Sequence, residues 1–267
     1  MTILDQSLCL LDGVSPEAEA RLRRKGVLTC SQLMNEAERH FSSTHAARVR
    51  QSFKEMSMAN SCNLVDWFVN HLPVGHRVRA LLSFMPDVTF YDIETDGMSS
   101  SARITCITTL RNGQFKSFVQ GRNLLDFLEV WSSTRILVGF NSKRFDTPAV
   151  CSAFGLSNVP AQVDLMDEAR HFGYRGGLKA IERLIGFKRK ALECNDGLDA
   201  VRMWNTYTVN KAEETLEKLL AYNQEDVLSL WYMADRLLKR SLENSQMTDA
   251  CLPPCSLTID SCDLSSA

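Results

Sequence analysis

The chain has 267 residues, of which 45% are hydrophobic and 23% charged, and its formal net charge is −2. This composition is typical of a globular protein with one large core and room for a small additional module. The near-neutral charge excludes a global basic surface, so any surface that binds nucleic acid must be local. There is no apolar run of 18 residues, and the N-terminus lacks the basic segment of a signal peptide. We therefore expect a cytoplasmic protein with no membrane contact.

Residues 1–55 are predicted to form a helical module. Gly13 precedes a Ser15-Pro16 helix start, and the helix that follows ends at Gly26. The segment resembles a helix-hairpin-helix motif, with Ser15 in place of the second glycine of the hairpin. In that family the backbone N–H groups of the hairpin contact a nucleic-acid phosphate. Four basic residues favour such a contact here: Arg21, Arg23, Arg24 and Lys25. A small packing module with a solvated charged face is an equal alternative. Residues 56–86 are predicted to be a helical linker.

The segment from Val88 to Gly97 is predicted to be a strand, because an apolar, β-branched and aromatic run ends in an Asp-Gly turn signal. Residues two apart on a strand share a face, so Asp92 and Glu94 point one way and Ile93 the other. Two like charges about 5 Å apart repel by roughly 3 kcal/mol at an effective dielectric constant of about 20. A divalent cation with oxygen ligands, Mg²⁺ or Mn²⁺, would relieve this repulsion. Alone the pair is weak evidence, because most such pairs lie on solvated faces.

The segments that follow indicate an α/β fold. An Asn-Gly turn joins two strand-like runs, Ala102–Leu110 and Phe115–Val119, so residues 87–119 are predicted to form three antiparallel neighbouring strands. The further predicted elements are a helix over Asn123–Trp131, a strand over Arg135–Asn141, a helix from about Phe145, an extended piece over Gln162–Leu165, a helix near Leu178–Leu184 and a last helix over about 211–239. This order over residues 87–240 is that of an RNase H-like mixed five-stranded sheet flanked by helices.

Beyond about Ser241 the chain is rich in Ser, Asp and Cys without periodicity, and we expect residues 241–267 to be a disordered tail. The nine cysteines of the chain are scattered and contain no CxxC pair. The three cysteines of the tail, Cys251, Cys255 and Cys262, match no standard zinc spacing.

Two further acidic positions accompany the strand pair. Asp146 follows the fourth predicted strand, at a helix start where an Asp often serves only as a cap. On the last helix Tyr222 and Asp226 are four residues apart and therefore share a face. An apolar stripe runs beside them and is expected to face the core: Leu219, Val227, Leu230, Ala234 and Leu237. A half-buried tyrosine beside a surface aspartate is a common arrangement, so this motif is also weak alone.

Together the motifs resemble those of the DEDD exonuclease superfamily, also called DnaQ-like, which has an RNase H-like fold. DxE lies on the first strand, NxxxFD (Asn141 to Asp146) follows the fourth, and YxxxD lies on the last helix, in matching order over roughly residues 85–240. The tyrosine four residues before the last aspartate resembles the DEDDy branch, like the proofreading domain of family B polymerases. Three stretches look similar to the YprB-like bacterial predicted exonucleases, in which a hairpin-like module also precedes the nuclease: Gly177–Glu182, Asp196–Val201 and Tyr222-Asn223.

The resemblance implies a two-metal-ion 3′–5′ exonuclease that hydrolyses phosphodiester bonds at single-stranded DNA or RNA ends. The implied ligands of two Mg²⁺ or Mn²⁺ ions, about 3.5–4 Å apart, are Asp92, Glu94, Asp146 and Asp226. Tyr222 would orient the attacking water. Because a phenol has a pKa of about 10, the metal must supply most of the acidity of that water. Metal binding is expected to stabilise the fold by relieving repulsion among the carboxylates.

Contacts with the substrate are also implied. Asn141 would lie beside the scissile nucleotide or hold the end of its strand, and Thr95 and Ile93 would flank the site and help to hold the terminal nucleotide. The candidate phosphate contacts are Lys143, Arg144, Arg175 and Lys179, although a solvated cation is the more common role for each. Other roles are expected for three nearby residues. Asp164 is expected to cap a helix, with support of the metal ligands as the alternative. Phe145 is expected in the core, with base stacking as the alternative, and His171 is expected to be a structural or surface residue.

A non-catalytic nucleic-acid-binding module with the same fold is the alternative function. The presence of all four acids and the tyrosine argues against it. An RNase H-type endonuclease is disfavoured, because such enzymes place their second acid on a helix and not two residues after the first. The sequence does not distinguish DNA from RNA as the substrate, since no reader of the 2′-hydroxyl is evident.

Overall fold

The computed structural model describes residues 2–97, 102–189 and 197–247. Its N-terminal part is helical, with 3-10 turns at Leu8–Leu10 and Met85–Asp87. The helices of this part are α1 (Ile3–Gln6), α2 (Pro16–Arg24), α3 (Cys30–His40), α4 (Ser43–Ser61), α5 (Val65–His71) and α6 (Val78–Phe84). Helix α2 begins as the sequence predicts, because the Ser15 side chain accepts a hydrogen bond from the Ala18 N–H. It ends before Gly26, whose φ of +87° disfavours other residues.

Residues 88–164 contribute a five-stranded mixed sheet with the order β3-β2-β1-β4-β5. The strands are β1 (Val88–Thr95), β2 (Ile104–Arg111), β3 (Gln114–Val119), β4 (Ile136–Gly139) and β5 (Ala161–Asp164). Strand β1 pairs antiparallel with β2 and parallel with β4, while β2 pairs antiparallel with β3 and β4 parallel with β5. The predicted RNase H-like mixed sheet flanked by helices is confirmed.

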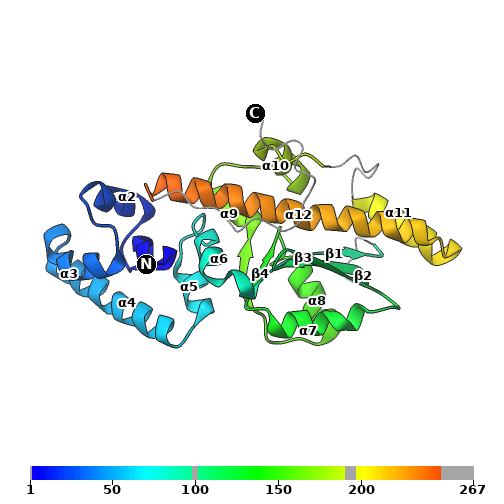
Figure 1. The fold of residues 1–267 in the computed structure, drawn as a ribbon, viewed down its shortest axis with the longest axis horizontal. Coiled ribbons are helices and arrows are strands. Elements are labelled where there is room, and N and C mark those ends of the chain that lie inside the picture. Colours follow the sequence, from blue (N-terminus) through cyan, green and yellow to red (C-terminus); the bar gives the residue numbers. More distant parts are fainter. Residues whose placement is uncertain (1, 98–101, 190–196, 248–267) are drawn as a thin grey trace.

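Helices cover both faces of the sheet (Figure 1). The long helix α12 (Glu213–Asn244) crosses one face, and α7 (Phe127–Ser133) and α8 (Asp146–Phe154) lie on the other. Strand β1 alternates between the two faces: Phe90 packs in the cluster that includes Leu230 of α12, whereas Tyr91 packs with Phe127 of α7. The predicted apolar stripe of α12 is fully buried, with each of its members at 0% exposure: Leu219, Val227, Leu230, Ala234 and Leu237.

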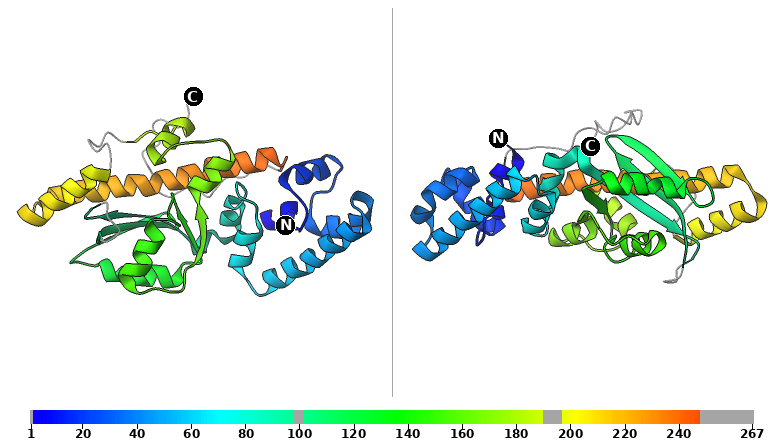
Figure 2. Two further views of the ribbon diagram at one scale, coloured as in Figure 1. Left: turned by 180° about the vertical axis from the view of Figure 1, so that it is seen from behind. Right: turned by 90° about the horizontal axis from the view of Figure 1, so that it is seen from below.

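Three more helices complete the described fold: α9 (Leu165–His171), α10 (Leu178–Ile185) and α11 (Gly197–Asn210). Helix α11 packs against the first half of α12, and the two extend together beyond the sheet at the end of the molecule opposite the N-terminal helices (Figure 2). The predictions did not include α9 or α11. The three tail cysteines and residues 248–267 of the predicted disordered tail lie outside the described residues. The start of that predicted tail is instead helical, because Ser241 and Leu242 are buried on α12.

No helix within residues 2–97, 102–189 and 197–247 combines the length and the apolar character needed to cross a membrane.

Candidate active site

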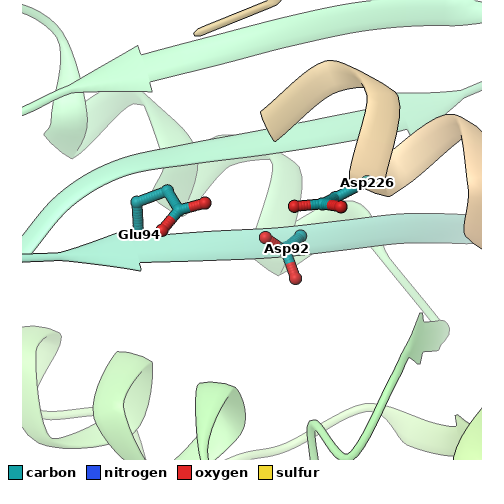
Figure 3. Close-up of side chains that lie close together, drawn as sticks. All are labelled: Asp92, Glu94 and Asp226. Carbon is teal, nitrogen blue, oxygen red and sulfur yellow. The ribbon is translucent and has the colours of Figure 1, made fainter. Parts of the chain in front are cut away.

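Three carboxylates converge where β1 faces α12 (Figure 3). Asp92 and Glu94 project from β1 toward the helix, and Asp226 points back at them from α12. One carboxylate oxygen of each residue lies within 4.8 Å of the other two. The alternation of the strand puts both β1 acids on the face that α12 covers. The pairing of β1 with β2 shifts in register just after Glu94, and such irregularities often re-aim side chains at sites.

The carboxyl groups have raised pKa values because they are buried together. Burial raises the pKa of Asp92 well above its ordinary value, and repulsion from Asp226, Asp146 and Glu94 adds to the rise. Burial and then the carboxylates of Asp226 and Asp146 raise the pKa of Glu94 to about 8. Burial raises the pKa of Asp226 to about 6, against the opposing effect of the Arg189 guanidinium. The site therefore gathers carboxyl groups whose deprotonated forms a cation would stabilise.

Asp146 approaches the same site from the other side of β1. It is the first residue of α8, and its carboxylate accepts a hydrogen bond from the Ile93 backbone N–H. Burial raises its pKa to about 7, and its charge in turn raises the pKa values of Asp92 and Glu94. Asp146 is thus electrostatically coupled to the other acids, although it is not one of the three whose oxygens lie within 4.8 Å of one another.

Asp164 organises the loop that leads from β4 to Asp146. Its Oδ1 accepts from the backbone N–H of Asn141 at 2.7 Å and from that of Met166 at 3.1 Å, and its Oδ2 accepts from that of Lys143 at 3.2 Å. Asp164 is therefore the N-cap of α9, as expected, and its hydrogen bonds also hold this loop in place. Asn141 has a φ of +58°, a conformation that asparagine tolerates better than most residues. The Asn141 Oδ1 is buried without a hydrogen-bond partner among the described residues.

Tyr222 lies one turn before Asp226 on α12 and is 4% exposed. Burial raises the pKa of its hydroxyl, and the nearby charges of Asp226 and Glu94 raise it further. The Lys179 ammonium lies 4.7 Å from the centre of the Tyr222 ring. The phenol therefore stays protonated at neutral pH and can donate a hydrogen bond, but it does not serve as a base.

The other residues predicted near the substrate are placed as follows. Thr95 donates its hydroxyl hydrogen to the Gly97 carbonyl at 2.7 Å, which fixes the end of β1. Ile93 packs on the α7–α8 side of the sheet. Lys143 is half-buried and Arg144 is exposed, both in the loop before α8. Arg175 is exposed and donates to the carbonyls of Arg170 and Tyr174.

Two of the expectations for neighbouring residues have clear outcomes. His171 is exposed, with its ring 5.4 Å from that of His76, as expected for a surface residue. The expectation that Phe145 belongs to the core is wrong, because its side chain is 66% exposed. Phe145 directly precedes α8, and the buried residues of this helix are Thr147 and Val150.

Two residues that contact the acidic cluster, Asn223 and Arg189, were not predicted as site residues. Asn223 is fully buried on α12, and its Nδ2 donates to Asp92 Oδ2 at 2.7 Å. Arg189 forms an ion pair with Asp226, and a second one with Glu182 of α10. The sequence offers only weak signals for these residues: Asn223 follows the motif tyrosine, and Arg189 stands in a run of basic residues with no periodicity.

These residues fit a divalent cation. The donor set consists of carboxylate oxygens, which Mg²⁺ and Mn²⁺ prefer. Burial raises the pKa values of Asp92, Glu94 and Asp226, and repulsion from neighbouring carboxylates raises those of Asp92 and Glu94 further. A bound cation would favour the deprotonated form of all three groups.

Comparisons with known proteins place the chain in a family. The model of the RNase_H superfamily, RNase_H_2, matches residues 89–238, more than half of the chain. The chain belongs to the RNase_H superfamily. A search of curated proteins found no match.

Among solved structures, the family B DNA polymerase from the hyperthermophilic archaeon Pyrobaculum calidifontis is similar, with 20% sequence identity and a TM-score of 0.47. The match covers 59% of this chain and 25% of the polymerase chain, so the chain spans about a quarter of that protein. At this level the likeness carries no argument about activity. The superfamily and the acidic cluster, in contrast, together support a nuclease type of activity with nucleic acid as substrate.

Proposed function

We propose that the protein is a metal-dependent 3′–5′ exonuclease of the DEDDy type that acts on single-stranded DNA or RNA ends. The observation that carries the proposal is the convergence of Asp92 and Glu94 of β1 with Asp226 of α12. Tyr222 lies one turn before Asp226 on the same helix, and the whole site lies inside an RNase_H superfamily domain. The similarity of the sequence motifs to the YprB-like group supports the finer assignment.

In this proposal Asp92, Glu94, Asp146 and Asp226 hold two Mg²⁺ or Mn²⁺ ions. When bound, the metal ions acidify the attacking water and neutralise charge on the phosphate. The carboxyl groups with raised pKa values release their protons as metal binds, since only the deprotonated form is a ligand. Tyr222 keeps its proton and orients the water by a hydrogen bond. Asn223 donates a hydrogen bond to one oxygen of Asp92 and thereby fixes the orientation of this carboxylate, which comes from β1.

The substrate strand would reach the site over the loop before α8. Asn141, Thr95 and the backbone at Ile93 are proposed to border the position of the terminal nucleotide, and Lys143 and Arg144 are proposed to contact phosphates. The exposed ring of Phe145 directly precedes Asp146 and offers a face on which a base can stack.

We also propose the division into a helical module (1–55), a helical linker (56–86) and the nuclease domain (87–240). The module is a candidate for nucleic-acid contact, because three of its basic side chains are exposed: Arg21, Arg24 and Lys25. Arg23, in contrast, is buried and donates to the Gln6 and Leu28 carbonyls.

The test is degradation of end-labelled single-stranded DNA and RNA by the full chain in Mg²⁺, in Mn²⁺ and in chelator. We expect a ladder of one-nucleotide steps from the 3′ end that requires metal and disappears in Asp92→Ala. Asp66→Ala is the matched control, because Asp66 is an exposed aspartate on α5 and is not a member of the acidic cluster. Binding of the labelled strands without degradation in any metal would favour the alternative, a non-catalytic nucleic-acid-binding module.

A further inference from the structure

Arg189 contacts the acidic cluster in a defined geometry. It follows α10, and its side chain reaches α12, where Nη2 donates to Oδ1 of Asp226. On the other side the same guanidinium engages Glu182 by two hydrogen bonds, from Nε at 2.8 Å and from Nη2 at 2.6 Å. Glu182 lies on α10, and its side chain is only 3% exposed. Glu182, Arg189 and Asp226 thus form a line of charged contacts that leads from α10 to the acidic cluster.

The pairing with Glu182 fixes the guanidinium. A planar guanidinium that makes two parallel bonds to one carboxylate has little freedom to rotate. Were Arg189 to leave when a metal ion binds, the Glu182 carboxylate would stay behind in a buried position without its partner, which is unfavourable. Arg189 is therefore built to remain in place and not to yield to an incoming cation.

The contact with Asp226 uses one carboxylate oxygen, Oδ1. Asn223 makes the same kind of contact with the facing acid, since it donates to Oδ2 of Asp92 at 2.7 Å. In each case a buried or paired side chain donates to one oxygen of the acid, so that the other oxygen remains for a metal ion. Groups that hydrogen-bond to metal ligands in this way fix their orientation, and their loss commonly weakens metal binding by about 10–100-fold.

We infer that Arg189 is a positioning residue, anchored by Glu182, that holds Asp226 in the orientation needed to ligate the divalent cation. The inference rests on the proposed function, because it assumes that Asp226 is a metal ligand. Arg189 itself does not contact the cation in this scheme. Its positive charge also partly offsets the carboxylate charge of the site while no metal is bound.

The test is the dissociation constant for Mn²⁺ of the full chain, measured by calorimetry and by the signal of free Mn²⁺ in electron paramagnetic resonance. Arg189→Gln is expected to raise this constant by about 10–100-fold. Arg189→Lys is expected to restore only part of the affinity, because an ammonium cannot bind Glu182 by two parallel bonds. Arg183→Gln is the matched control: Arg183 is an exposed arginine of α10, the helix that carries Glu182, and its loss should leave the constant unchanged.

A double-mutant cycle tests whether Glu182 acts through Arg189. Glu182→Gln alone is expected to weaken Mn²⁺ binding, and the double variant is expected to bind no more weakly than Arg189→Gln. A general loss of packing would instead give additive effects, and that result would overturn the role of the anchor. Circular dichroism in chelator checks that each variant is folded; if Arg189→Gln does not fold, Glu182→Gln decides, and unchanged Mn²⁺ binding in it overturns the inference.

The outcomes separate this inference from the proposed function. Failure of the wild-type chain to bind Mn²⁺ would count against the metal-dependent nuclease itself. Wild-type binding together with unchanged binding in Arg189→Gln would overturn the positioning role alone. Tighter binding in Arg189→Gln would also overturn it, because Arg189 would then compete with the metal ion for Asp226.

Discussion

The individual carboxyl groups of the site make the stability of the folded protein depend on pH. In the folded chain the pKa is about 8 for Glu94, about 7 for Asp146 and about 6 for Asp226. In the unfolded chain such groups titrate at about 4. Because the folded state binds these protons more tightly, the contribution of the site to stability is most favourable below about pH 4 and is lost as the pH rises to about 8.

We therefore expect the melting temperature in chelator to fall by several degrees between about pH 5.5 and about pH 8. Added Mg²⁺ or Mn²⁺ should reduce this fall, since metal binds the deprotonated carboxylates. Differential scanning calorimetry of the wild-type chain and of Glu94→Gln measures the effect. The variant should show a shallower pH dependence, because the uncharged side chain removes one titrating group. An identical pH profile for the two proteins would contradict the electrostatic description of the site.

The Tyr222 hydroxyl allows a test that separates water orientation from metal binding. Tyr222→Phe keeps the buried ring beside Lys179 and removes only the hydroxyl. We expect cleavage to slow by about 100-fold, the lower range for a positioned proton-handling group, while Mn²⁺ affinity stays the same. Single-turnover cleavage and Mn²⁺ titration of the same preparation measure the two quantities. A parallel loss of Mn²⁺ affinity would show that Tyr222 shapes the metal site instead.

At the scale of elements, the end of β4 sets the position of the loop that carries Asn141 and leads to Asp146. Gly139 ends β4, and a Cβ atom there would lie 2.6 Å from the Ser142 Cβ, a distance that forces the loop to move. Gly139→Ala is therefore expected to destabilise the fold by about 1–3 kcal/mol and to lower cleavage activity. Gly177→Ser is the control, because nothing lies within 4 Å of a Cβ at that position and serine is a good N-cap for α10. Urea unfolding of both variants measures the difference, and equal stability would refute the steric argument.

The elements also show what the sequence can predict and what it cannot. The strand alternation of Asp92 and Glu94 and the four-residue spacing of Tyr222 and Asp226 are local rules, and the structure follows them. The hairpin signal predicts the pairing of β2 with β3, and the α/β succession predicts the mixed five-stranded sheet. The ion pair of Arg189 depends instead on how α10 packs against α12, which no local period encodes. The exposure of Phe145 likewise depends on the angle at which α8 leaves the loop.

At the scale of the whole molecule, the N-terminal helices and the sheet domain share one hydrophobic core, a single cluster that runs from Leu4 to Met247. A buried ionic network joins the parts. Arg79 of α6 donates to Glu19 of α2 at 2.9 Å, and to the Ser241 side chain of α12 at 2.8 Å. The side chains of Arg79 and Glu19 are both 0% exposed. The N-terminal helices are thus tied to the same helix that carries Asp226 and Tyr222.

Breaking this network tests whether residues 1–55 unfold with the nuclease domain. Glu19→Gln leaves the Arg79 charge buried without its partner, which is expected to cost about 3–5 kcal/mol. Glu17→Gln is the control on the same helix, where Glu17 is exposed and its loss should change stability little. Urea unfolding followed by circular dichroism and by tryptophan fluorescence should give one shared transition at lower urea in Glu19→Gln. Two separate transitions would mean that the helical module unfolds independently, and the shared core would then contribute little to its stability.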